Sequence, residues 1–296
     1  MKLQSPLLRK FCARWNSRIP EVAVIRAVES VFPDLKKAIP PIDPFHLATF
    51  RRVKQIVNTE LAFDGVISLT SSGDYVIQLS SELTEERRRF TVAHEIGHTL
   101  FFDLEDRVSS RFRVVDSHIE SFHPDSGEER ICNLVAEEIL MPSAHFLSRI
   151  QLFPPIASTI LQLSKEFKTS IHATSHRAVQ LSPYKLIICM WEYKANMNLY
   201  ETVWVVRNGH YKGAAQEKFI VTDDQPIFRA FNAKTGFRGK KWISLGGPIG
   251  QYFVDCIVLG RQAMRLITVF ILETDAERLV GTKADIAAST DELRLF

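Results

Sequence analysis

The chain has 296 residues, of which 46% are hydrophobic, 24% charged and 10% aromatic. This composition is typical of folded domains and excludes disordered, collagen-like and coiled-coil proteins, and the length suits two compact units. The 37 basic and 34 acidic residues give a net charge of +3, without the positive excess that dominates nucleic-acid affinity, so direct nucleic-acid binding is not expected.

The cysteine pattern predicts the compartment. Cys12, Cys132, Cys189 and Cys256 are far apart in the sequence and form no CxxC pair. They are typical of thiols in a reducing compartment rather than of a disulfide framework or a four-thiolate zinc site. Charged residues interrupt the N-terminal segment before an apolar signal region can form, and the longest apolar runs have strand length. We therefore expect a cytoplasmic protein without a membrane partner.

The first predicted elements are helical and are followed by short strands. The proline-rich segment Ile39–Pro44 separates an N-terminal helical arm from the rest of the chain. Three β-strands with turn residues between them are predicted at Val53–Val57, Gly65–Leu69 and Tyr75–Leu79. This order predicts a small sheet directly after the helical arm.

Two longer helices follow, with a polar segment between them. The first is predicted from its N-cap, Thr84, to about Asp103, because acidic residues occupy the first turn and apolar residues recur at helical spacing. Residues 104–127 are polar and lack periodicity, which is typical of a lid or a disordered segment. The second helix is predicted at about Glu128–Leu140, because the chain then reaches Pro142.

The remaining sequence changes from helical to strand patterns at Pro183. Two short helices are predicted first, at Ile156–Phe167 and Ser170–Gln180. The predicted strands are Leu186–Trp191, Val203–Val206, Phe253–Leu259 and Leu266–Leu272. The second half is therefore predicted to be a separate α+β or β-rich domain. The basic and aromatic stretch Phe237–Trp242 is compatible with nucleic-acid binding, but a solvated hairpin turn is the favoured interpretation.

The first long helix contains His94-Glu95-Ile96-Gly97-His98, an HExxH motif. Residues four apart share a helix face, so both imidazoles can bind one ion. Zinc suits two neutral imidazoles plus a carboxylate and leaves a position for water, which Glu95 can contact without ligating the metal. The alternative is an amphipathic helix with two surface histidines. Flanking apolar residues favour a buried face, and buried paired histidines require a ligand.

The second long helix offers the third ligand. Glu129 and Asn133 are one turn apart, so Glu129 can bind the metal while Asn133 hydrogen-bonds a ligand imidazole. Glu128 is a rival for the ligand position. It is otherwise interpreted, like Glu137 and Glu138, as a solvated charge on the helix face.

Residues Glu85–Phe102 (EERRRFTVAHEIGHTLFF) and Glu129–Pro142 (ERICNLVAEEILMP) resemble the ImmA/IrrE family of zinc metallopeptidases. The three upstream strands also resemble the sheet that precedes the zinc helix in that family. The resemblance implies one zinc ion per chain, with His94, His98 and Glu129 as its ligands and Glu95 as the catalytic base.

One residue departs from the family pattern. Most members have alanine where Cys132 stands, and a thiol at this position is open to oxidation or to adventitious metal binding.

The resemblance also implies the architecture of the whole chain. We expect an α+β protein with a gluzincin-like zinc peptidase domain at residues 1–152, which combines the N-terminal arm, a three-stranded sheet and the zinc helices. Residues 153–182 resemble the helix-turn-helix-like region of IrrE-type proteins, and residues 183–296 resemble their GAF-like domain, to which a sensor role is assigned.

The implied function is a zinc-dependent endopeptidase that cleaves a helix-turn-helix transcriptional repressor in a stress or DNA-damage response. His118 and His123, in the polar segment, are candidates for stabilising the tetrahedral oxyanion, because a lid can bring either over the zinc. The alternatives are a non-hydrolytic zinc regulator that binds a partner or DNA, and a general cytosolic peptidase. The presence of Glu95 argues against the first, and the accessory domains argue against the second.

Overall fold

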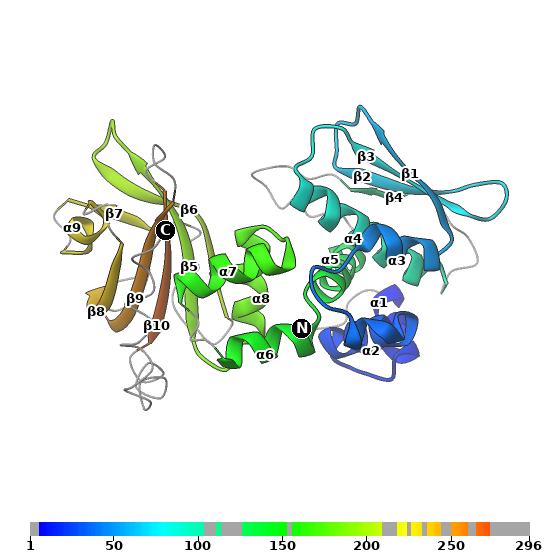
Figure 1. Cartoon of the computed structure of the whole chain (residues 1–296), viewed down its shortest axis with the longest axis horizontal. Coiled ribbons are helices and arrows are strands. Elements are labelled where there is room, and N and C mark those ends of the chain that lie inside the picture. The colour runs from blue at the N-terminus through cyan, green and yellow to red at the C-terminus, as the bar shows by residue number, and fades with distance from the viewer. Residues whose placement is uncertain are drawn as a thin grey trace. The chain divides into compact units, whose positions relative to one another are not determined.

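The computed structural model describes residues 6–103, 111–113, 126–152, 156–208, 218–223, 226–232, 236–243, 250–259 and 265–272. The chain divides into two compact units (Figure 1). The first comprises residues 1–146 and 164–173, and the second comprises residues 147–163 and 174–296. Among the helices of the described ranges, none combines the length and the apolar character needed to cross a membrane.

The predicted N-terminal helical arm is confirmed. It consists of α1 (Pro6–Arg14), α2 (Pro20–Val31) and the 3-10 helix η1 (Pro33–Lys37). A further short helix, α3 (Pro44–Phe50), which was not predicted, follows the proline-rich segment. All four begin at a proline, whose fixed φ and missing N–H suit the first turn of a helix. The side chain of Asp43 also caps α3 by accepting a hydrogen bond from the backbone N–H of Phe45 at 2.9 Å.

The three predicted strands form the first sheet, with one short addition. Strands β1 (Val53–Thr59), β2 (Gly65–Leu69) and β3 (Tyr75–Ser80) are joined by β4 (Arg111–Arg113), in the order β1-β3-β2-β4. Strands β1 and β3 are parallel and the other pairs are antiparallel. Ile67 and Ile77 are paired across β2 and β3 and are both fully buried, which fixes one face of the sheet against the core.

Both predicted long helices are present, as α4 (Glu85–Phe102) and α5 (Ser126–Leu140). The hydroxyl of Thr84 caps α4 by accepting a hydrogen bond from the N–H of Arg87 at 3.3 Å. The side chain of Arg51, which follows α3, binds the other end of α4. Its guanidinium donates to the carbonyl oxygen of Thr99 at 3.0 Å and to the carboxylate of Asp103 at 2.6 Å. The helix that carries the HExxH motif is therefore held at both ends.

Three shorter helices follow: α6 (Ser143–Leu152), α7 (Ala157–Phe167) and α8 (Ile171–Leu181). The last two were predicted, but α6 was not. Its start is fixed by Glu138, whose carboxylate accepts hydrogen bonds from the N–H and the hydroxyl of Ser143 at 2.9 and 2.6 Å. The interpretation of Glu138 as a solvated charge is wrong, because this capping contact buries it. Helices α6, α7 and α8 each contribute to both units.

The second unit contains an antiparallel sheet of six strands in the order β7-β6-β5-β10-β9-β8 (Figure 1). The strands are β5 (Leu186–Lys194), β6 (Leu199–Arg207), β7 (Ile220–Thr222), β8 (Phe237–Ile243), β9 (Gly250–Leu259) and β10 (Arg265–Leu272), with α9 (Pro226–Asn232) between β7 and β8. The α+β class is thereby confirmed. The prediction of a hairpin turn at Phe237–Trp242 is wrong, because these residues form the edge strand β8, which pairs with β9.

An aromatic cluster forms the core of this sheet. Trp191 is fully buried against Phe231 of α9, with ring centroids 5.2 Å apart, and its indole N–H donates to the hydroxyl of Thr268 at 2.7 Å. Buried aromatic rings with a satisfied polar group stabilise a core of this size. The GAF-like assignment of this unit, the helix-turn-helix assignment of α7 and α8, and the three-part division of the chain remain predictions.

Candidate metal centre

Helix α4 places the two histidines of the HExxH motif side by side in the interior. His94 and His98 are both fully buried, with ring centroids 4.9 Å apart, as expected for residues one helical turn apart. Helix α5 packs alongside and supplies the polar groups that surround them. The Nε2 atom of His94 lies 3.1 Å from Oε2 of Glu129, and the Nε2 atom of His98 lies 3.4 Å from Oε1 of the same carboxylate. One carboxylate from α5 therefore faces both imidazoles.

The opposite edges of the imidazole rings are also engaged. The Nδ1 atom of His94 lies 2.9 Å from Oδ1 of Asn133, and the Nδ1 atom of His98 lies 3.0 Å from Oε1 of Glu128. An acceptor at Nδ1 favours the tautomer that carries its hydrogen there, which leaves the lone pair on Nε2 for a metal. Both rings thus present Nε2 toward Glu129.

The interpretation of Glu128 as a solvated charge on the helix face is therefore wrong. It is buried, and its contact is with Nδ1 of His98, on the ring edge away from Nε2. Sequence spacing could have indicated this position, because Glu128 and Cys132 are four residues apart, like Glu129 and Asn133. The two pairs form adjacent stripes of α5, and both stripes face the histidines.

Cys132 provides a second potential donor set. Donor atoms of His94, His98 and Cys132 all lie within 4.8 Å of one another. The Sγ atom of Cys132, however, is 3.5 Å from Nδ1 of His98, the same ring atom that Glu128 contacts. Glu129 contacts the Nε2 atoms of both histidines, so the geometry favours the His-His-Glu set over the His-His-Cys set.

The surroundings of these residues favour a cation. Burial disfavours the charged form of His98, but the neighbouring Cys132, Glu128 and Glu95 outweigh this effect and raise its pKa well above the ordinary value. Burial also raises the pKa of the Cys132 thiol to about 11, although His98 opposes the shift. Glu95 is fully buried beside His94. Buried carboxylates and imidazoles at this density are stabilised when they share a bound metal ion, and two imidazoles with one carboxylate suit Zn²⁺.

Two of the sequence candidates cannot be placed. His118 and His123 lie outside the described residues, so their role as oxyanion helpers remains a prediction. Gly97 was missed by the sequence reasoning as a functional position. It lies where α4 and α5 approach each other, and a Cβ atom on Gly97 would be 2.9 Å from Cα of Cys132.

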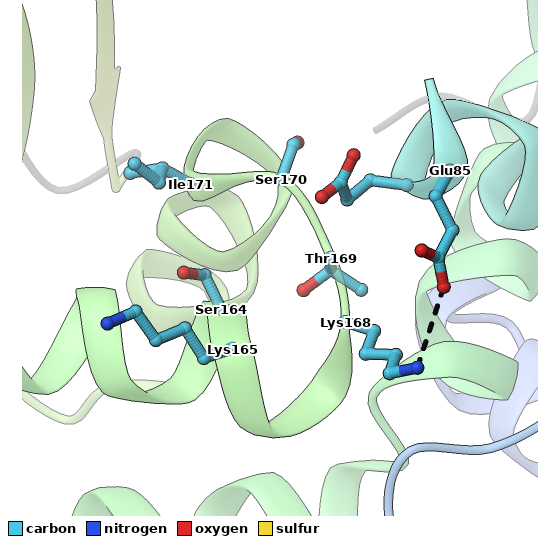
Figure 2. A pocket seen from close by; sticks show the side chains of 8 residues that line it. Glu85, Ser164, Lys165, Lys168, Thr169, Ser170 and Ile171 are labelled. Carbon is cyan, nitrogen blue, oxygen red and sulfur yellow. Dashed lines mark ion pairs between the residues drawn. The ribbon is translucent and has the colours of Figure 1, made fainter. Parts of the chain in front are cut away.

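A separate hollow of about 380 Å³ lies in the first unit, between the start of α4 and the turn that joins α7 and α8 (Figure 2). It is lined by Glu85, Glu86, Ser164, Lys165, Lys168, Thr169, Ser170 and Ile171. Figure 2 shows Lys168 directed at Glu85, with 3.5 Å between their charged atoms. None of the residues of the HExxH motif lines this hollow, so the hollow is distinct from the histidine cluster.

Comparison with known proteins relates the region that contains this site to a peptidase family. Residues 51–179 match the model of the IrrE N-terminal-like domain, a peptidase family, and this range includes α4 and α5. The matched region, residues 51–179, is similar to the IrrE N-terminal-like peptidase family and makes up less than half of the chain.

Two curated relatives share this region. The chain is 30% identical over 112 residues to the radiation response metalloprotease IrrE of Deinococcus radiodurans, covering 38% of this chain and 33% of that protein. It is 30% identical over 101 residues to the protein of the same name from Deinococcus deserti, covering 34% of each. The match thus spans about a third of the length of these relatives.

The fold is similar to that of a solved structure, a Mycobacterium tuberculosis transcriptional regulator. The TM-score is 0.53 at 14% sequence identity, and the similarity covers 94% of this chain and 84% of that one. At this identity the similarity concerns the fold alone.

Proposed function

We propose that this protein is a zinc-dependent endopeptidase. The observation that carries the proposal is the convergence of the Nε2 atoms of His94 and His98 on the two carboxylate oxygens of Glu129. Glu95, the fully buried carboxylate next to His94, provides the base that hydrolysis requires. The similarity of residues 51–179 to a peptidase family, and relatives named metalloproteases, support the same conclusion.

The proposed mechanism assigns a task to each side chain. His94, His98 and Glu129 would hold the zinc ion, which supplies a Lewis acid that polarises the scissile carbonyl and acidifies water. Glu95 takes the proton of the attacking water and delivers it to the leaving amine. Asn133 holds the ring of His94 by its contact with Nδ1.

The substrate that we propose is a helix-turn-helix transcriptional repressor, cleaved in a stress or DNA-damage response. Relatives named radiation response metalloproteases support a protease that acts in a stress response, whereas the repressor substrate rests on the family resemblance of the sequence. Residues 183–296 are proposed to act as a sensor domain. We further propose a cytoplasmic location, which the free and buried state of all four cysteines supports.

One observation favours a second candidate, a regulator that binds without hydrolysis. Cys132 lies close enough to both histidines to belong to a metal cluster. If both Cys132 and Glu129 ligated the ion, the site would have four protein ligands, which is typical of structural zinc.

A comparison of two variants of α4 distinguishes these functions. Glu95→Gln keeps the size of the side chain but cannot accept a proton, whereas Glu86→Gln removes an exposed charge from the same helix. The genes beside this one are searched for a small helix-turn-helix protein, which is incubated with the purified proteins, and fragments are identified by mass spectrometry. We expect Glu95→Gln to retain one equivalent of zinc and to cleave at least about a hundredfold more slowly. Glu86→Gln should match the wild type. A wild-type protein that binds zinc but cleaves no repressor, while still controlling its target genes, would favour the non-hydrolytic function.

A further inference from the structure

The two histidines differ in the group that holds the far edge of each ring. Nδ1 of His94 faces the neutral amide oxygen of Asn133, whereas Nδ1 of His98 faces the carboxylate oxygen of Glu128. A charged carboxylate acceptor forms a stronger hydrogen bond than a neutral amide oxygen, and the two distances are alike, 3.0 Å for Glu128 and 2.9 Å for Asn133. The carboxylate also raises the basicity of the imidazole more, which strengthens the bond from Nε2 to a metal.

The position of Glu128 suits a side chain that accepts a hydrogen bond from His98. Glu128 lies in the first turn of α5, where the unpaired backbone N–H groups give the helix terminus a partial positive charge. It is only 6% exposed, so water does not screen its interaction with His98. A carboxylate in these surroundings requires a strong hydrogen-bond donor, and the Nδ1–H group of His98 is one.

We propose that Glu128 is a positioning residue that sets the zinc affinity of the site through His98. The proposal rests on the zinc-dependent function proposed above. Glu128 does not ligate the metal, because it contacts the ring edge opposite to the one that faces Glu129. It fixes the tautomer and the orientation of the ring, and the negative charge strengthens His98 as a ligand. The site therefore has one strongly held and one more weakly held imidazole.

Cys132 is the rival for this role, since its Sγ atom also lies near Nδ1 of His98, at 3.5 Å against 3.0 Å for Glu128. Sulfur is a weak acceptor, and Cys132 is buried in the contact with Gly97. The thiol therefore fills space beside the ring, while the carboxylate accepts its hydrogen.

The proposal is tested by the dissociation constant for Zn²⁺, measured in the full-length protein by competition with a chromophoric chelator. Glu128→Ala should bind zinc about 10–100-fold more weakly. Glu128→Gln, which keeps an acceptor oxygen but loses the charge, should lie between Glu128→Ala and the wild type. Cys132→Ala and Glu137→Gln, the latter a loss of charge elsewhere on α5, should leave the constant unchanged within about threefold.

A reciprocal substitution separates the charge from the packing. Asn133→Asp has nearly the same shape but places a carboxylate at Nδ1 of His94, so it should tighten zinc binding by about threefold or more. A merely structural role for these side chains would not produce a gain of affinity. The visible absorption spectrum of the Co²⁺-substituted protein should shift in Glu128→Gln and Asn133→Asp, because the donor strength of a ligating imidazole changes in each.

Three outcomes would overturn the proposal. The first is a folded Glu128→Ala variant that binds zinc as tightly as the wild type, and the second is weaker zinc binding in Cys132→Ala but not in the Glu128 variants. The third is complete loss of zinc in Glu128→Gln, which would make Glu128 a ligand. If Glu128→Ala does not fold, Glu128→Gln and Asn133→Asp still decide the matter. A wild-type protein that binds no zinc would instead refute the proposed function itself.

Discussion

Gly97 of α4 packs directly against the backbone of Cys132 in α5. A Cβ atom at Gly97 would lie 2.9 Å from Cα of Cys132, closer than such atoms approach in proteins, and 3.1 Å from its Cβ, which is an unusually tight contact. The two helices therefore approach each other within the HExxH motif at a distance that only glycine allows. This approach brings Glu129 and Asn133 of α5 within reach of the two imidazoles.

The first prediction concerns this contact. Gly97→Ala should destabilise the protein by about 1–3 kcal/mol, because α5 must move away to relieve the overlap, and zinc affinity should fall with it. Urea unfolding and zinc titration measure the two effects. The double variant Gly97→Ala/Cys132→Ala should remain destabilised, since the overlap is with the backbone of Cys132. Full recovery in the double variant would show that only the thiol is crowded.

The second prediction decides the third ligand. Glu129→Ala should lose most of its bound zinc, since this carboxylate faces Nε2 of both histidines, whereas Cys132→Ser should keep one equivalent. Atomic absorption on the purified variants gives the stoichiometry. The reverse pattern would assign the site to His94, His98 and Cys132.

A third prediction compares two adjacent arginines. Arg51→Gln should cost about 1–2 kcal/mol of unfolding free energy, because its guanidinium binds the carbonyl oxygen of Thr99 and the carboxylate of Asp103 at the end of α4. Arg52→Gln is the matched control. The side chain of Arg52 is largely exposed, and its Nε atom lies 3.6 Å from Oδ1 of Asp74. Its substitution should therefore change the free energy of unfolding by no more than about 0.5 kcal/mol. Equal effects of the two substitutions in urea unfolding would contradict the capping role of Arg51.

The fourth prediction concerns alkaline stability. Burial, with a contribution from Asp255, raises the pKa of the Cys256 thiol to about 12 from an ordinary value near 9. Between these two pKa values the unfolded chain releases the thiol proton and the folded chain keeps it. The contribution of Cys256 to the free energy of unfolding is therefore fully present below about pH 9 and is lost as the pH rises toward 12. The slope is at most about 1.4 kcal/mol per pH unit for one thiol. Cys256→Ala should lose this part of the slope in urea unfolding between pH 8 and pH 11. Parallel slopes for the variant and the wild type would mean that the folded thiol ionises normally.

Local signals in the sequence were sufficient for the elements around the site. The N-cap at Thr84, the helical spacing after it and the break at Pro142 predicted α4 and the end of α5, and turn residues separated the three strands. These signals involve neighbouring residues, so they are readable without the fold. The HExxH spacing likewise identified His94 and His98 as a pair.

What the sequence could not provide was the pairing between distant segments. Spacing puts Glu128 and Glu129 on adjacent stripes of α5, but which of them faces Nδ1 of His98 and which faces Nε2 depends on how α5 packs against α4 near Gly97. The edge strand β8 carries three basic residues and a glycine, so it resembles a turn until β9 supplies its hydrogen-bond partners. Helix α6 begins where Glu138 caps it, a contact that a count of charges does not reveal.

The two units alternate along the chain. Residues 164–173 belong to the first unit, but the segments on both sides of them, 147–163 and 174–296, belong to the second unit. During synthesis on a ribosome, the first unit cannot be complete until residue 173 has emerged. By then the start of α7 has emerged as well, while Asp255, whose carboxylate accepts the N–H of Ala157 at 2.8 Å in the finished second unit, is still untranslated. A gene truncated after the helices would therefore encode the whole histidine site together with a helix whose capping residue is never made.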